Sequence, residues 1–166
     1  MIARFLRQKH PAYRNFQLVY TVLTLNFLIP ATSYLVAPDM AVQGIHDMSA
    51  WLTQAPYTVS EDSHMWRFLA VSDVMTLGFM CLLLQLNLRR WFPILLPLMF
   101  LKGSCVVASA YVGLFQYNHA FFVIPVVLDS VTVAAMWFFA TRAHRQITRS
   151  TDGDLVPRPR FVQVAP

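Results

Sequence analysis

Charged residues are scarce in this sequence. Only 13% of its 166 residues are Asp, Glu, Lys or Arg, about half of the share found in an average soluble domain. Because 57% of the residues are hydrophobic, a disordered chain is excluded as well, since disorder needs low hydrophobicity and high net charge. The two cysteines and five glycines exclude a disulfide scaffold and a collagen-like chain. The class that remains is a small polytopic membrane protein.

Four long apolar stretches are present, and each has the roughly 20 residues that a helix needs to cross the hydrocarbon core. They run from about residue 16 to 37, 66 to 86, 91 to 115 and 119 to 141. Continuous apolarity without period-two alternation predicts helices and not barrel strands. The expected fold is all-α, a bundle of four transmembrane helices. A basic head at 1–15, an outer loop at 38–65 and a basic, proline-containing tail at 142–166 complete it.

The positions of Lys and Arg predict the orientation of the spans. Basic residues gather in the head, the second loop and the tail, whereas the outer loop carries only acidic charges. Cytoplasmic loops hold the excess of Lys and Arg. We therefore expect a multi-pass protein of the bacterial inner (plasma) membrane with both termini in the cytoplasm. The first apolar run is longer than the h-region of a signal peptide, about 7–15 residues, so we expect an uncleaved anchor.

The outer loop favours a short amphipathic helix. Asp39 follows Pro38 and is a candidate N-cap, and several apolar side chains beyond it fall near one helical face. Such a helix would lie on the outer membrane surface. It is either a lid or docking face for a partner, or a connector whose apolar side rests on lipid. Trp51, Trp66 and Arg67 are the residues expected at this interface.

Three charged residues lie well inside the predicted spans: Asp73, Lys102 and Asp129. A charge at the bilayer centre costs at least about 2.5–3.5 kcal/mol, so unpaired ones are rare. With a rise of about 1.5 Å per residue, Lys102 and Asp129 fall near the midplane and Asp73 about one turn farther out. Lysine can reach across that offset. We expect one cluster where three spans meet, faced by the polar side chains Thr76, Ser109, Thr132 and Asn26.

Two roles are open for this cluster. In the first, Lys102 pairs with Asp129, Asp73 bonds to a hydroxyl group, and the set fixes the register of the helices. In the second, two aspartates against one lysine leave an excess negative charge, which favours a proton on one carboxyl group. The cluster would then carry protons or bind a small lipophilic ligand such as a quinone.

Catalytic and metal-binding motifs are missing. His46, His64 and His119 share the outer side, but no short ligand spacing supports a metal site among them. The sequence has no P-loop, no Gly-x-Ser-x-Gly and no His-Glu-x-x-His, and no base-stacking motif for nucleic acid. We expect no metal and no cofactor other than a bound lipid or quinone, and a membrane enzyme ranks last among the functions.

Two segments, WRFLAVS at 66–72 and FLKGS at 100–104, resemble parts of the small four-helix bacterial membrane proteins called DoxX-like. The order of elements is also similar: a basic head, one span, an amphipathic outer stretch and three closely spaced spans. This resemblance implies an accessory membrane subunit, since some such proteins are thought to serve quinone-linked oxidoreductases, and it implies no catalytic residue. We expect an accessory or assembly subunit of a respiratory or photosynthetic complex, in contact with other membrane subunits or a second copy.

Overall fold

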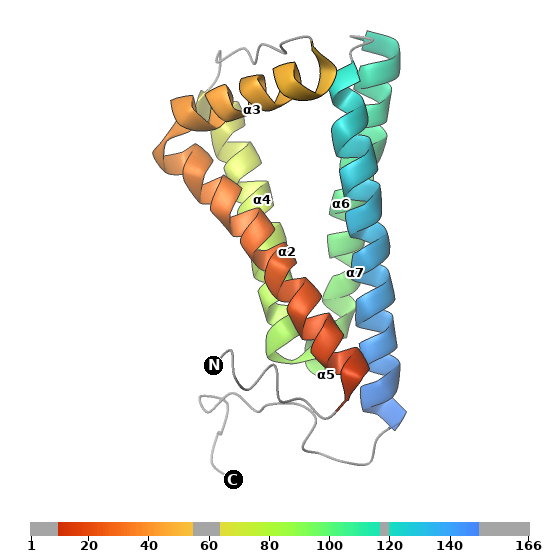
Figure 1. Cartoon of the computed structure of the whole chain (residues 1–166). Helices are drawn as coiled ribbons and strands as arrows, with labels where there is room; N and C mark the ends of the chain where they lie inside the picture. Colours follow the sequence, from red (N-terminus) through yellow and green to blue (C-terminus); the bar gives the residue numbers. More distant parts are fainter. Residues whose placement is uncertain (1–9, 55–63, 117–119, 150–166) are drawn as a thin grey trace.

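A computed structural model describes residues 10–54, 64–116 and 120–149 of the chain, with the side chains of 64–67 and 120 left outside the description. Every element in these ranges is helical (Figure 1). In chain order they are α2 (Pro11–Val36), α3 (Pro38–Thr53), α4 (His64–Leu86), α5 (Leu88–Trp91), η1 (Phe92–Ile94), α6 (Leu95–Tyr111), η2 (Val112–Gln116), η3 (Ala120–Phe122) and α7 (Val123–Arg149).

Four segments of the described residues are long and apolar enough to cross a membrane, as the hydropathy pattern predicted. They are Pro11–Val36, Phe68–Leu86, Leu88–Gln116 and Val123–Arg149. The all-helical class and the four apolar spans are therefore confirmed.

Helix α2 begins earlier than expected, inside the region assigned to the basic head. Pro11 occupies the first turn, where its missing N–H would be unsatisfied in any case. Tyr13, two residues later, is fully buried. The head is therefore partly a packed helix.

Helix α7 ends later than expected, because it continues through residues assigned to the tail as far as Arg149. Ala143 and Ile147 pack into the core from this extension. Arg89 Nη2 also donates to the carbonyl oxygen of Ile147 at 3.4 Å, and arginine is a favourable partner for carbonyls near a helix C-terminus. A hydropathy criterion overlooks such a mixed helix end, since its exposed positions are polar.

Helix α3 lies between the first two spans, where the sequence predicted a short helix, but its start differs in detail. The N-cap position is Ala37, without a side-chain cap, and Pro38 takes the first helical turn. Asp39 therefore lies within the first turn and not at the N-cap. A carboxylate in that place still interacts favourably with the positive end of the helix dipole.

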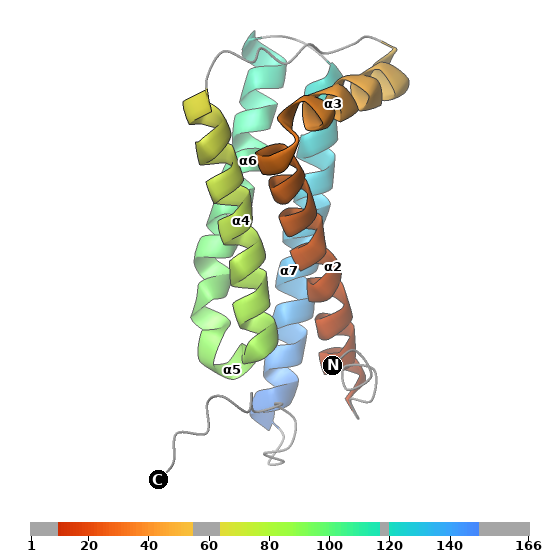
Figure 2. The same ribbon diagram turned by 90° about the vertical axis from the view of Figure 1, so that its left-hand side faces the viewer.

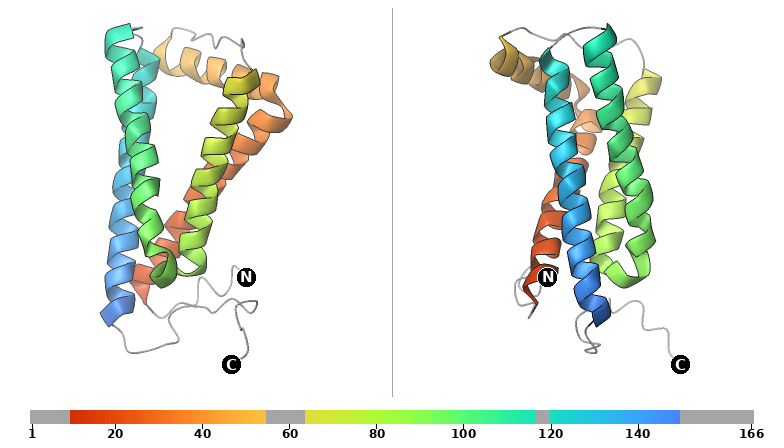
Figure 3. Two further views of the ribbon diagram at one scale, coloured as in Figure 1. Left: turned by 180° about the vertical axis from the view of Figure 1, so that it is seen from behind. Right: turned by 90° about the vertical axis from the view of Figure 1, so that its right-hand side faces the viewer.

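The spans are arranged as two pairs, α2 along α4 and α6 along α7, with a further contact between α2 and α7. The pairs converge at the end where α2 begins and α7 ends, and they diverge toward the other end (Figures 1 and 3). There α3 runs across from α2 to η3. We call these the converging end and the α3 end. A compact four-helix bundle stays a prediction.

Most core side chains lie toward the converging end. Tyr20, Leu84, Leu98 and Met136 are all fully buried and come from the four spans. The short α5 turns the chain from α4 into α6 at this end (Figure 2), and Asn87 Oδ1 accepts from the backbone N–H of Arg90 at 3.0 Å. This end therefore holds the two helix pairs together.

Candidate functional site

An ion pair joins α6 to α7. Lys102 Nζ lies 2.6 Å from Asp129 Oδ1, and the two side chains are only 13% and 17% exposed. The pairing expected from their matching depth is thus present. Lys102 Nζ also lies 5.2 Å from the centre of the Phe27 ring on α2, within the range of a cation–π interaction. The ammonium group therefore connects three of the four spans.

Asp73 on α4 does not join that pair. Its side chain is exposed, and neither ion pair among the described residues involves it. The structure thus pairs two of the three charges and leaves the third carboxylate without a hydrogen bond from any described residue.

The other polar residues expected at the cluster form no hydrogen bond to these charges within the described residues. Thr76 Oγ1 donates to the carbonyl oxygen of Ser72 in its own helix, at 2.8 Å. Ser109 and Thr132 are partly buried. Asn26 is exposed, because α2 buries a row of positions three and four apart to which it does not belong.

A buried hydrogen-bond network between α2 and α4 was not predicted. Gln17 Nε2 donates to Tyr13 Oη at 2.8 Å and to the carbonyl oxygen of Gln85 at 3.0 Å. Gln85 Nε2 donates to Thr24 Oγ1 at 2.7 Å and to the carbonyl oxygen of Tyr20 at 3.0 Å. The sequence did contain a signal for this network. Gln17 and Thr24 lie about two turns apart on one helical face, and Gln85 lies near the end of the second span.

This network also reaches α7. Tyr20 Oη donates to the carbonyl oxygen of Met136 at 3.0 Å, and Thr21 Oγ1 donates to Gln85 Oε1 at 2.9 Å. Its members are amides and hydroxyl groups, which bond to one another without changing charge at neutral pH. Its chemistry therefore suits the fixing of helix register and not acid–base catalysis.

Of the residues expected at the outer interface, the structure describes one side chain. Trp51 on α3 is 80% exposed. Trp66 and Arg67 belong to α4, but their side chains lie outside the described residues. The interface assignment stays a prediction for these two residues.

The three histidines weighed as metal ligands are described only in part. His46 Nδ1 lies 3.5 Å from Asp47 Oδ1 on α3. The side chains of His64 and His119 lie outside the described residues. The part of the chain that the structure describes contains no group of three His, Cys, Asp or Glu residues able to hold a metal ion.

No family model matches the sequence, and comparisons with curated proteins and with solved structures find no match. The resemblance to DoxX-like proteins therefore stays an expectation, and functional assignment rests on the geometry of the chain itself.

Proposed function

We propose that this protein is a non-catalytic accessory or assembly subunit of a larger membrane complex. The observation that supports this most is Asp73, an exposed carboxylate within an apolar span. Lipid can cover the apolar side chains of α4, but it offers this carboxylate no hydrogen-bond donor. A transmembrane helix of another subunit that carries a donor would satisfy it, and polar contacts of this kind help hold membrane helices together.

The low burial of two spans agrees with that proposal. Only 11% of the apolar window of Leu88–Gln116 and of Val123–Arg149 is buried within the chain. Association of membrane helices depends on close packing, and these faces are free to provide it. The partner is thus another membrane subunit or a second copy of this chain.

The orientation belongs to the same proposal. The converging end, with its arginines, would face the cytoplasm of a bacterial inner membrane, and α3 would lie on the outer surface as an amphipathic helix. Met40 and Trp51 on α3 are 78% and 80% exposed. Large apolar side chains insert at the boundary between headgroups and acyl chains. Helix α3 would therefore lie parallel to the membrane surface.

Purification from native membranes in a mild detergent, followed by native gel sizing, tests the proposal. We expect the full chain to migrate with partner chains, and Asp73→Leu to lose them. Asp47→Leu, at an exposed position on α3, is the matched control and should keep them. Migration of the wild type as a bare monomer without any partner would contradict the proposal.

A second candidate function is the binding of a proton or a small lipophilic ligand, such as a quinone, at the region of Asp73, Lys102 and Asp129. It is favoured by one observation: the ion pair balances two of the charges and leaves Asp73 as an exposed acceptor within its span. In vesicles loaded with a short-chain ubiquinone, Asp73→Asn should then weaken quinone binding while assembly stays intact. Loss of assembly with unchanged quinone binding favours the subunit role.

A further inference from the structure

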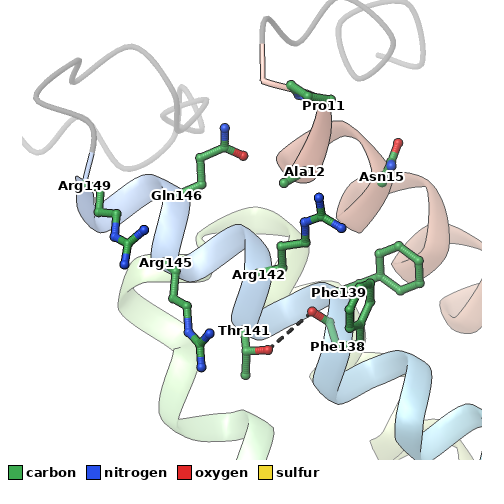
Figure 4. Close-up of a pocket in the computed structure, with 10 residues that line it drawn as sticks. All are labelled: Pro11, Ala12, Asn15, Phe138, Phe139, Thr141, Arg142, Arg145, Gln146 and Arg149. Atoms are coloured by element: carbon green, nitrogen blue, oxygen red, sulfur yellow. Dashed lines mark hydrogen bonds between the residues drawn. The ribbon is translucent and has the colours of Figure 1, made fainter.

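A groove of about 700 Å³ lies at the converging end, where the first turns of α2 meet the last turns of α7 (Figure 4). Asn15 lines it from α2, and Arg142, Arg145 and Arg149 line it from α7. The rings of Phe138 and Phe139 form its apolar wall. The groove therefore combines three positive charges with an aromatic surface.

The three arginines have no acidic partner within the described residues. The two ion pairs found there join other residues, and the described aspartates lie on α3 or within the spans α4 and α7. The guanidinium carbon of Arg142 lies 5.7 Å from the centre of the Phe138 ring. Three guanidinium groups thus line this groove without a described counter-charge, and a bound anion would supply one.

The place of the groove in the fold limits what that anion can be. Phe138 and Phe139 belong to the apolar part of α7, and the arginines follow directly after it. The groove thus lies where the hydrocarbon of a bilayer would give way to headgroups. Figure 4 shows Arg142 extending from α7 toward Ala12 and the first turns of α2.

We propose that this groove binds the phosphate group of an anionic phospholipid. The planar guanidinium of Arg142 would pair with two phosphate oxygens, a geometry for which arginine is suited. Arg145 and Arg149, on the neighbouring turns, add attraction for the negative charge. The Phe138 and Phe139 rings cover the first part of an acyl chain, which a free phosphate ion lacks.

Lipid titration of the purified full chain tests this proposal. In a nonionic detergent, phosphatidylglycerol should raise the melting temperature, whereas phosphatidylcholine and inorganic phosphate at equal concentration should not. Arg142→Gln should weaken phosphatidylglycerol binding by about tenfold or more, because it removes the charged pair with two phosphate oxygens. One decade in affinity corresponds to about 1.4 kcal/mol of binding free energy. Arg142→Lys, which keeps the charge but loses the planar pair, should fall in between.

Arg90→Gln is the matched control, since Arg90 is an exposed arginine at the same end that packs over Trp91 outside the groove. It should bind phosphatidylglycerol like the wild type. Equal weakening by Arg90→Gln and Arg142→Gln would mean general charge attraction and would overturn the site. Equal stabilisation by inorganic phosphate would overturn the lipid assignment in favour of a phosphate site. If Arg142→Gln does not fold, Arg145→Gln/Arg149→Gln provides the same comparison against Arg90→Gln.

Discussion

At the scale of single residues, the ion pair between Lys102 and Asp129 is expected to contribute strongly to stability. Removal of one partner leaves the other charge uncompensated in low dielectric, at a cost of about 3–5 kcal/mol, whereas replacing both partners by apolar residues is often neutral. We expect Lys102→Met or Asp129→Leu alone to be strongly destabilising and the double variant to recover most of the loss. Unfolding by SDS titration in mixed micelles measures this. Single variants as stable as the wild type would show that water reaches the pair.

Gln85 allows a second test at the same scale. Gln85→Leu removes the donor to the Thr24 hydroxyl oxygen and one of two side-chain donors to the Tyr20 carbonyl, which still accepts from Thr24 Oγ1. Hydrogen bonds between membrane helices contribute on the order of 1 kcal/mol. We expect a loss of about that size in the free energy of unfolding. Gln43→Leu is the control, because among the described residues the Gln43 amide bonds only to Asp47, in its own helix. An equal effect of the two substitutions would contradict a structural role for the network.

The residue scale also shows what sequence reasoning could reach. Because charges are rare in membrane spans, Lys102 and Asp129 could be predicted as partners from the sequence. Their equal depth follows from the rise per residue of a helix. Gln17 and Gln85 lie toward the span ends, where neutral polar residues are common and carry little signal. The separation of Asp73 from the pair could not be predicted from the sequence, because it depends on how far the helix pairs diverge.

At the scale of elements, Gly78 sets the approach of α4 to α2. A Cβ atom there would lie 2.8 Å from Leu28 Cδ2, whereas one at Gly103 on α6 would meet nothing within 4 Å. Gly78→Leu should therefore separate the helices and cost about 1–3 kcal/mol, as overpacking of a close contact does. Gly103→Leu should not lower stability, since leucine forms helices better than glycine. The melting temperatures of the two variants in the same detergent measure the difference.

Hydropathy predicts which segments form the spans, but it does not predict where the helices begin and end. Four apolar runs were enough to find the spans, because only a helix satisfies the backbone of a run of that length in lipid. The start at Pro11 and the end at Arg149 were missed, since those turns pack one face on the core and present polar side chains on the other. Hydropathy averages over both faces and so ends a helix too early.

At the scale of the whole molecule, the convergence of the helix pairs at one end predicts uneven stability. The buried side chains and the glutamine network lie mostly toward the converging end, whereas the α3 end has few buried side chains, Ala31 and Val71 among them. Amide groups open most readily where few apolar contacts cover them. Hydrogen exchange in detergent should therefore be slowest in the first half of α2 and the second half of α4. Slower exchange toward the α3 end would contradict the described core.

The orientation of the molecule in the membrane can be tested with reporters placed at its two ends. Arg14, Arg89, Arg90 and the arginines of the last turns of α7 lie at the converging end, whereas the described acids of the outer loop, Asp39 and Asp47, lie on α3. A reporter that fluoresces only in the cytoplasm should therefore be active when fused after the full chain and inactive when inserted after Gln54. Because Lys and Arg near the spans determine orientation, replacing Arg89 and Arg90 by Gln should reduce the fraction of correctly oriented chains. Activity of the reporter after Gln54 alone would place α3 in the cytoplasm and reverse the assignment of both faces.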